Sequence, residues 1–225
     1  ENPPVVLDFS DSPLGAGEGI VVCEVVSQSV DTVVFKGPVG SRAIKLEAGY
    51  RIGFKDSTFG SDTISLGAMR MGGSRNDLLS VDSWALDAGK GKPGVIHHGD
   101  NDSPLKQYLV GGLAGGCSGS KSAAGMPEAA TVEYPGAQQW IAVKNRFFVT
   151  ALVKCDEAVK GFAATVKRDV NASNYRPESV TVKAKFDLSR QVRETTFYVG
   201  PKKQSLLWDL GMKDVMEFGM WRWLC

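Results

Sequence analysis

Strict alternation of apolar and polar side chains is the clearest pattern in the chain. At residues 179–189 every second side chain is apolar, and Thr, Lys, Asp or Ser stands between. Because successive side chains of a strand point to opposite faces, this run predicts a strand with one buried face. Residues 42–47 and 50–56 repeat the pattern, and Ala48 and Gly49 between them favour a hairpin turn.

Shorter apolar runs predict further strands along the whole chain. They lie at residues 20–26, 32–36, 62–69, 81–86, 108–113, 130–134, 140–153, 162–169 and 192–199. Residues 72–76, 87–102 and 111–127 are rich in Gly, Ser, Asp and Lys, so we expect long surface loops there. Many short strands with Gly-rich turns, and no internal repeat, predict one all-β domain of the sandwich type.

One helix is well signalled, directly after the last predicted strand. Pro201 has the fixed φ that suits a first helical position, and Gly211 can adopt the left-handed conformation that ends a helix. Between them, Leu206, Leu207 and Leu210 form an apolar stripe at helical spacing. The sequence therefore predicts a short amphipathic helix that lays its leucines on another apolar surface.

The last six residues are unusually apolar and aromatic. Met220, Trp221, Trp223 and Leu224 surround Arg222. Paired indoles beside an arginine are typical of a membrane–water interface, where the ring lies in lipid and its N–H in the headgroup layer. We therefore expect residue 225 to lie just short of a bilayer, and we interpret the chain as an excised soluble piece because it has neither an initiating Met nor a signal peptide.

Composition agrees with one globular core and argues against nucleic acid as a partner. The 225 residues are 43% hydrophobic and 23% charged, with a formal net charge of +1. That balance supplies enough apolar material for a single large core and no basic bias toward phosphates. No run in the sequence approaches the roughly 18 to 20 apolar residues of a membrane-spanning helix.

The cysteines give no sign of a metal site or a redox centre. Cys23, Cys117, Cys155 and Cys225 are widely and irregularly spaced, without a CxxC pair. We therefore predict no metal and no cofactor. A disulfide among Cys23, Cys117 and Cys155 stays possible, since pairing cannot be deduced from spacing.

Two weak motifs invite an enzyme hypothesis, and neither supports it. His97 and His98 are candidates for a general base. Adjacent residues of an extended chain point to opposite faces, however, and neither histidine has an evident acidic partner. We therefore expect a pair of solvated histidines in a loop. Residues 115–122 read GGCSGSKS, where Ser120 replaces the second glycine of a phosphate-binding loop. No catalytic residue is predicted.

Three segments, taken in order, resemble one known family. They are residues 140–153 (WIAVKNRFFVTALV), 197–207 (FYVGPKKQSLL) and 217–225 (EFGMWRWLC). A Trp-led strand with an aromatic pair, an aromatic-Val-Gly-Pro segment that starts a helix, and a Gly-aromatic segment that enters a transmembrane helix resemble the end of the large periplasmic domain of the bacterial membrane protein insertase YidC. The chain departs from the family at Lys154 and Cys155, where a proline is common.

The resemblance implies a fold, a place and a set of partners. It implies a β-supersandwich resembling galactose mutarotases over residues 1–199, and a C-terminal helical segment over residues 200–225 that leads into a truncated transmembrane helix. Insertase activity in that family belongs to transmembrane helices, so this domain would be non-catalytic, without a cofactor. It would act at the periplasmic face of the inner membrane, as part of a multi-pass protein, and contact Sec translocon components and nascent inner-membrane proteins.

Six residues are the candidates for contact with a partner or for lying near the membrane. They are Leu206, Leu207, Leu210, Phe218, Trp221 and Trp223. The leucines would pack the helix onto the sandwich, and Val215, Met216, Phe218 and the tryptophans would continue toward the bilayer. This arrangement would fix the orientation of the domain. An equally weighted alternative is that the leucines are only a lid on the core.

Two other classes of protein stay open. A carbohydrate-binding or mutarotase-like sandwich would stack sugar rings on Trp84, Trp140 or Tyr108, although a mutarotase needs a general acid and a general base that are not recognisable here. An interaction domain of the lipoprotein or adhesin type, with no insertase attached, is the third hypothesis. It differs from the first in predicting a stop codon after Cys225.

Overall fold

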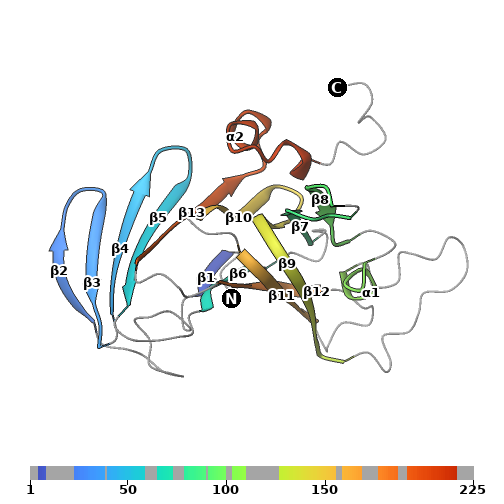
Figure 1. Ribbon diagram of the computed structural model, residues 1–225, viewed down its shortest axis with the longest axis horizontal. Helices are drawn as coiled ribbons and strands as arrows, with labels where there is room; N and C mark the ends of the chain where they lie inside the picture. Colours follow the sequence, from blue (N-terminus) through green and yellow to red (C-terminus); the bar gives the residue numbers. More distant parts are fainter. Residues whose placement is uncertain are drawn as a thin grey trace, which may run out of the picture.

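The computed structural model describes residues 5–8, 23–38, 40–58, 65–72, 79–89, 91–99, 103–109, 127–155, 159–168, 177–186 and 192–216. These residues form one antiparallel sheet of 13 strands, with two short helices and a 3-10 turn (Figure 1). The elements are β1 (Val5–Asp8), β2 (Glu24–Gln28), β3 (Thr32–Lys36), β4 (Gly40–Glu47), β5 (Arg51–Thr58), β6 (Ser65–Gly72), β7 (Ser80–Ala85), β8 (Gly94–His97), α1 (Lys106–Leu109), β9 (Ala129–Lys144), β10 (Phe148–Cys155), β11 (Val159–Arg168), β12 (Pro177–Lys185), β13 (Val192–Pro201), α2 (Gln204–Asp209) and η1 (Lys213–Val215). The predicted all-β fold is confirmed.

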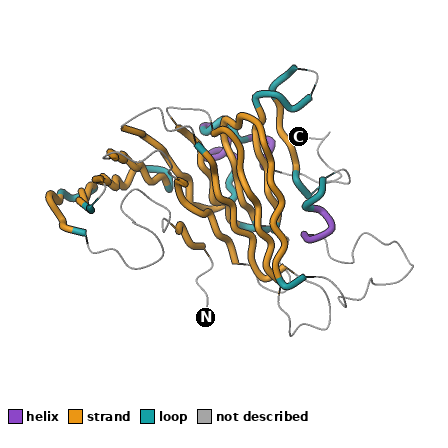
Figure 2. Tube along the Cα trace, turned by 60° about the horizontal axis from the view of Figure 1, so that its bottom comes forward, coloured by secondary structure: helices purple, strands orange, loops and turns teal. Residues whose placement is uncertain are grey.

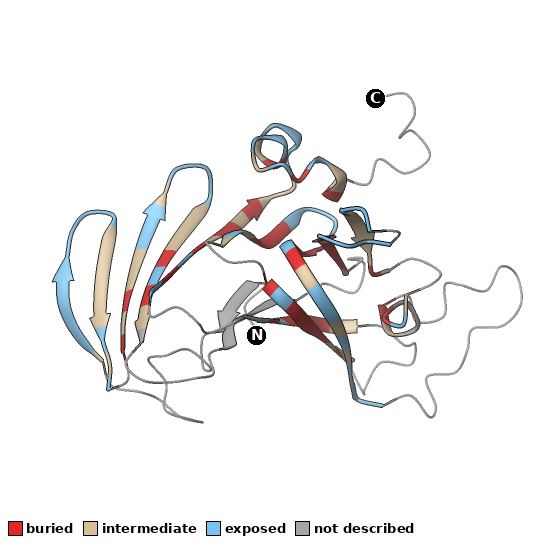
Figure 3. Ribbon diagram, in the orientation of Figure 1, coloured by how far each residue is buried: buried red, intermediate tan, exposed pale blue. Residues whose placement is uncertain are grey.

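The strands follow the order β1-β6-β12-β11-β9-β10-β13-β5-β4-β3-β2, and β7 and β8 branch from β9. Figure 2 shows the long central strands running side by side, with the hairpins β2–β3 and β4–β5 extending to one side. Figure 3 shows the consequence for burial: β2 is exposed along its length, whereas buried positions concentrate in the central strands. The sheet is an open, sandwich-like layer with its core at the centre.

Strand β9 is the hub of this sheet. Ile141 pairs with Ser83 of β7 on one edge and with Leu152 of β10 on the other. Further along the same strand, Gln138 pairs with both β7 and β11. Strands β10 and β11 therefore run one after the other along one edge of β9, which leaves its other edge to β7.

Alternation along the central strands builds one apolar cluster on each face of the sheet. Ile141 of β9 contributes to the first cluster and Trp140 to the second, and Phe197 and Tyr198 of β13 divide in the same way. The buried residues of the first cluster are Phe54, Leu79, Val81, Leu105, Leu109, Ile141, Val143, Leu152, Val159, Phe162, Ala164, Val166, Val180, Val182, Ala184 and Phe197. Those of the second are Trp140, Ala142, Val149, Ala151, Tyr198, Leu207, Met212 and Val215. A sheet buried on both faces needs a cover on each, and α2 with η1 covers the second.

The predicted strand at residues 140–153 is in fact two antiparallel strands. Residues up to Lys144 end β9, and Phe148 begins β10. The turn depends on a side chain: Asn145 Oδ1 accepts hydrogen bonds from the backbone N–H groups of Phe147 and Phe148, at 2.8 and 2.7 Å. Because this turn is made by asparagine, without Gly or Pro, the sequence lacks the usual turn signal between the two strands.

Two predicted assignments in the middle of the chain are wrong. Part of the loop expected at residues 87–102 is the strand β8, in which Val95 and Ile96 pair with β7. Tyr108, expected to begin a strand, lies in α1, where its N–H group and that of Leu109 donate to the carbonyl of Leu105. Leu105 and Leu109 are four residues apart, so one helical turn places both in the first cluster.

The C-terminal helix begins later than the sequence predicts. Pro201 is the last residue of β13, and α2 starts at Gln204 with Lys203 in extended conformation before it. The strand continues because the N–H of Lys202 donates to the carbonyl of Phe147, 2.7 Å away.

Tyr50, expected in a strand, stands in the β4–β5 turn with φ 63. No helix in the described part of the chain is long and apolar enough to cross a membrane.

Candidate functional site

The C-terminal segment of the described chain is fastened to the second face of the sheet. Leu207 of α2, Met212 just before η1 and Val215 of η1 are fully buried. They pack with Trp140 and Tyr198 in the second cluster. Leu206 and Leu210 are half-buried against the same cluster. The leucine stripe read from the sequence therefore faces the sheet, and its central member lies deepest.

Backbone geometry turns the chain so that both parts of the segment can bury apolar residues. Gly211 has φ +69, a conformation that residues with a Cβ rarely adopt, and it ends α2 as predicted. Directly after it, the N–H of Met212 donates to the carbonyl of Leu207 at 2.8 Å. The chain then enters η1 at Lys213, which returns Val215 to the sheet. The expectation that Val215 continues toward the bilayer is therefore wrong, because its side chain is fully buried in the second cluster.

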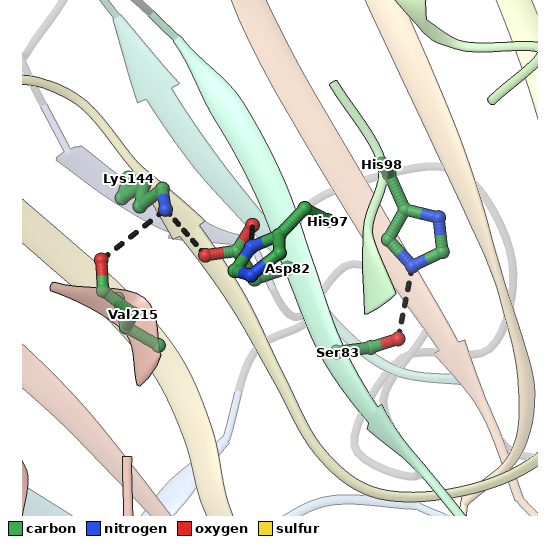
Figure 4. Close-up of polar contacts among 6 residues, drawn as sticks. All are labelled: Asp82, Ser83, His97, His98, Lys144 and Val215. Atoms are coloured by element: carbon green, nitrogen blue, oxygen red, sulfur yellow. Dashed lines mark hydrogen bonds and ion pairs between the residues drawn. The ribbon is translucent and has the colours of Figure 1, made fainter. Parts of the chain in front are cut away.

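A buried lysine joins this segment to the sheet (Figure 4). Lys144, 1% exposed, directs its ammonium group to Asp82 Oδ2 at 2.5 Å and donates to the carbonyl of Val215 at 3.2 Å. Asp82 is itself fully buried on β7. A buried ion pair is retained only where each charge has close partners, so the carbonyl of Val215 is part of what satisfies this lysine.

The two histidines face different partners, as their adjacency predicts. His97 Nδ1 lies 3.1 Å from Asp82 Oδ1, on the side of the carboxylate away from Lys144 (Figure 4). His98 Nε2 lies 2.9 Å from Ser83 Oγ. The expected solvated loop pair is wrong, since His98 is only 2% exposed, and so is the expected absence of an acidic partner for His97.

His98 lies in an aromatic pocket. Its ring centroid is 4.2 Å from that of Tyr134 and 5.2 Å from that of Phe162. Burial lowers the pKa of His98 to about 4, because the charged ring would lose its hydration; the Asp82 carboxylate opposes this shift and His97 adds to it. His98 Nδ1 has no hydrogen-bond partner among the described residues, so the proton belongs on Nε2, which donates to Ser83.

The hydroxyl of Ser83 and the ring of His98 are enclosed by the fold. Ser83 is fully buried and His98 nearly so, which keeps a substrate from the hydroxyl. A Ser-His nucleophile also needs a third group to orient the base, and no described residue bonds His98 Nδ1. Among the residues described, no cluster of three His, Cys, Asp or Glu side chains could hold a metal ion.

The aromatic candidates fall into two groups. Phe218, Trp221 and Trp223 lie outside the described residues. Trp140, a candidate for stacking on sugars, is 3% exposed and belongs to the second cluster, with its ring centroid 6.5 Å from that of Trp84. A buried indole offers no platform to a carbohydrate, so this part of the sugar-binding hypothesis is wrong.

Three participants of the site were missed by sequence reasoning: Asp82, Lys144 and the carbonyl of Val215. Lys144 carried a signal, because it is a charged residue that directly follows the apolar run Ile141 to Val143. Its partner lies 62 positions away on β7. Nothing in the sequence pairs the two, since a long-range contact has no local pattern.

Comparison with known proteins shows which family this region resembles. Residues 118–225 match the family model described as the YidC periplasmic domain, and no curated protein matches the chain. The matched range contains β9 to β13, α2 and η1, which together build most of the second cluster and hold Lys144. It also contains all three segments whose sequences resemble that family, so the resemblance is confirmed. Over residues 118–225 the chain is therefore similar to the YidC periplasmic domain family.

Proposed function

We propose that the chain is the non-catalytic periplasmic domain of a YidC-type membrane protein insertase, an accessory scaffold that works beside the insertion machinery. Residues 1–199 are the scaffold, and residues 200–225 connect it to the membrane-embedded core. The partners of the scaffold are Sec translocon components and nascent inner-membrane proteins. The match of residues 118–225 to the family model of the YidC periplasmic domain supports this proposal.

One observation carries the mechanical part of the proposal. The segment from Gln204 to Val215 is held by buried side chains on both α2 and η1 and by Lys144 from within the sheet. A segment fixed at several points moves with the sheet as one body, because packed interiors deform little. The domain therefore sets the direction in which residues 217–225, with Trp221 and Trp223, leave it.

A non-catalytic role agrees with the polar chemistry of the sheet. The ionisable side chains Asp82, Lys144 and His97 neutralise or bond one another, and each also serves to join elements. The enzyme alternative needs an exposed acid and base at one open site, whereas Ser83 and His98 are enclosed. The mutarotase-like alternative has no observation that favours it.

The test is made in the membrane protein that carries this chain. Trp221→Ala with Trp223→Ala should reduce insertion of an inner-membrane substrate in cells depleted of the native insertase. The melting temperature of the 225-residue chain should stay nearly unchanged. Val30→Ser, at a fully exposed position between β2 and β3, is the matched control and should leave insertion intact. Normal insertion in the double variant would reject the proposal, and a large fall in melting temperature would make the tryptophans core residues.

A further inference from the structure

Four large aromatic side chains are exposed near the point where β13 leads into α2. Tyr50 and Phe147 are each 57% exposed, Phe148 is 48% exposed and Trp208 is 56% exposed. Phe147 and Phe148 stand at the β9–β10 turn, Tyr50 stands in the β4–β5 turn, and Trp208 is on α2. We call these four residues the aromatic rim.

Contacts with residues 199–202 bring three members of the rim together: Tyr50, Phe147 and Phe148. On one side, the carbonyl of Phe147 accepts from Lys202, and Phe148 pairs with Pro201. On the other side, the carbonyl of Tyr50 accepts from the N–H of Val199 at 2.9 Å. The Tyr50 side chain lies so close to Gly200 that a Cβ there would stand 2.7 to 2.8 Å from it. The β4–β5 turn and α2 lie on the same upper side of Figure 1.

The charges around the rim are mainly basic. Arg51 follows Tyr50, Arg146 precedes Phe147, and Lys202 and Lys203 lead into α2, against the acidic Glu47 and Asp209, so four positive charges face two negative ones. The guanidinium of Arg146 lies 5.3 Å from the centre of the Phe147 ring. Arginine over an aromatic ring, with lysines near, attracts anions and presents apolar surface at one place.

Folding alone does not account for this surface. The β9–β10 turn is made by the side chain of Asn145 and the backbone, so polar residues at 147 and 148 would serve the turn equally well. Exposed aromatic rings mixed with arginine and lysine have the composition of protein surfaces that lie in the headgroup layer of a bilayer.

The described chain also ends beside the rim. Val215 bonds Lys144, which is followed directly by Asn145 and the turn that carries Phe147. From Met216 the sequence continues through Trp221, Arg222 and Trp223, the same combination of aromatic ring and arginine.

We propose that the aromatic rim is a lipid-binding surface, which places this edge of the sheet in the headgroup layer of an anionic bilayer. The proposal rests on the proposed function, which brings the domain to the membrane. The rim then adds a second contact beside residues 217–225, and two contacts hold an orientation that one does not. The rings enter the interface while Arg146 and Lys203 bind lipid phosphates.

Vesicle flotation of the 225-residue chain tests the proposal. The vesicles contain phosphatidylethanolamine and phosphatidylglycerol, with pure phosphatidylcholine for comparison. Phe147→Ser with Phe148→Ser should lower partitioning onto the anionic vesicles at least about fivefold, since two interfacial rings are lost. Val25→Ser with Val26→Ser is the matched control, because it removes two exposed apolar side chains from β2, and it should leave partitioning unchanged.

Two further variants separate the rim from the rest of the chain. Arg146→Glu with Lys203→Glu should weaken binding to the anionic vesicles only, and added salt should reduce the difference from wild type. The Phe variant is measured again with Trp221→Ala and Trp223→Ala present, where it should still lower what binding remains. Unchanged melting temperatures show that the variants fold.

The proposal is overturned if the wild-type chain does not float, or if the Phe variant floats as well as wild type. Normal flotation of the Phe variant is also the result expected if the rim binds a protein and not lipid. If either flotation result is found while the Trp221 and Trp223 variant still shows the expected insertion defect, the lipid-binding rim is rejected and the proposed function stands. If the rim binds vesicles as expected but the Trp221 and Trp223 variant inserts its substrate normally, the proposed function is rejected.

Discussion

The ammonium group of Lys144 donates a hydrogen bond to the carbonyl oxygen of Val215, 3.2 Å away and 71 positions later in the chain. This bond joins the end of β9 to η1 inside the protein, where the same lysine is paired with Asp82. One buried cation thus connects β7, β9 and the C-terminal segment. The connection explains why a lysine follows three apolar residues at the buried end of β9.

Lys144→Met should destabilise the chain by about 3 to 5 kcal/mol, because it leaves the carboxylate of Asp82 buried without its cation. Urea denaturation followed by circular dichroism measures the loss. Lys55→Met is the matched control: Lys55 pairs with Glu194 at 2.8 Å, but both side chains are more than half exposed, so a much smaller loss than for Lys144→Met is expected. Equal losses for the two lysines would contradict the assigned role of Lys144.

Leu207→Ala should cost about 2 to 5 kcal/mol, since it opens a cavity in the second cluster where Leu207 is fully buried. Trp208→Ala, one residue further on the exposed side of the same helix, should change stability by less than about 0.5 kcal/mol. Thermal unfolding of both variants makes the comparison. A larger effect at Trp208 than at Leu207 would mean that α2 is rotated on the sheet.

Arg42 and Asp56 form a second buried ion pair, between β4 and β5, with Nε to Oδ1 at 2.6 Å and both side chains 3% exposed. Asp56→Ala should destabilise by about 3 to 5 kcal/mol, because it strands the guanidinium in the interior. The double variant Arg42→Met with Asp56→Leu should recover most of that loss, since no buried charge is left. If the double variant is as unstable as the single one, charge burial is not the cause.

The stability of the chain should also fall in mild acid because of His98. Its pKa is about 4 in the folded chain, against an ordinary value of 6.5, so between these values the unfolded chain binds the extra proton and stability falls as pH falls. The loss attributable to this residue approaches about 3 kcal/mol at the lower end of the window. Denaturation midpoints of wild type and His98→Gln from pH 7 to pH 4 measure it. Parallel pH profiles for the two proteins would contradict the assignment.

Much of the sheet could be predicted from the sequence because its rules are local. The alternation of apolar and polar residues at 179–185 and in the hairpin of residues 42–56 predicts strands, because successive side chains of a strand point to opposite faces. The structure has β12, β4 and β5 there. The prediction failed where a turn is made without Gly or Pro, at Asn145, and where Pro201 ends a strand and does not begin a helix. At Asn145 a local side-chain hydrogen bond makes the turn, and after Pro201 the contact of Lys202 with the distant Phe147 extends the strand.

The candidate site was predictable only in part, for the same reason. The leucines at helical spacing indicate that α2 packs on an apolar surface. That surface is a face of the sheet made by β9, β10 and β13, which only the fold brings together. The Asp82 to Lys144 pair joins residues 62 positions apart. The remaining candidates, Phe218, Trp221 and Trp223, lie outside the described residues, and their contact with the membrane stays a prediction.

Amide hydrogen exchange of the chain under native conditions measures most directly whether the C-terminal segment is part of the rigid sheet. The N–H groups of Leu207, Met212 and Val215 donate within the segment, and Ala151 of β10 lies beneath it as the internal reference. We expect the three amides to exchange with an opening free energy close to that of Ala151, because they open only when the sheet does. Exchange of the three amides several kcal/mol easier than that of Ala151 would show a segment that detaches on its own, and would contradict the account.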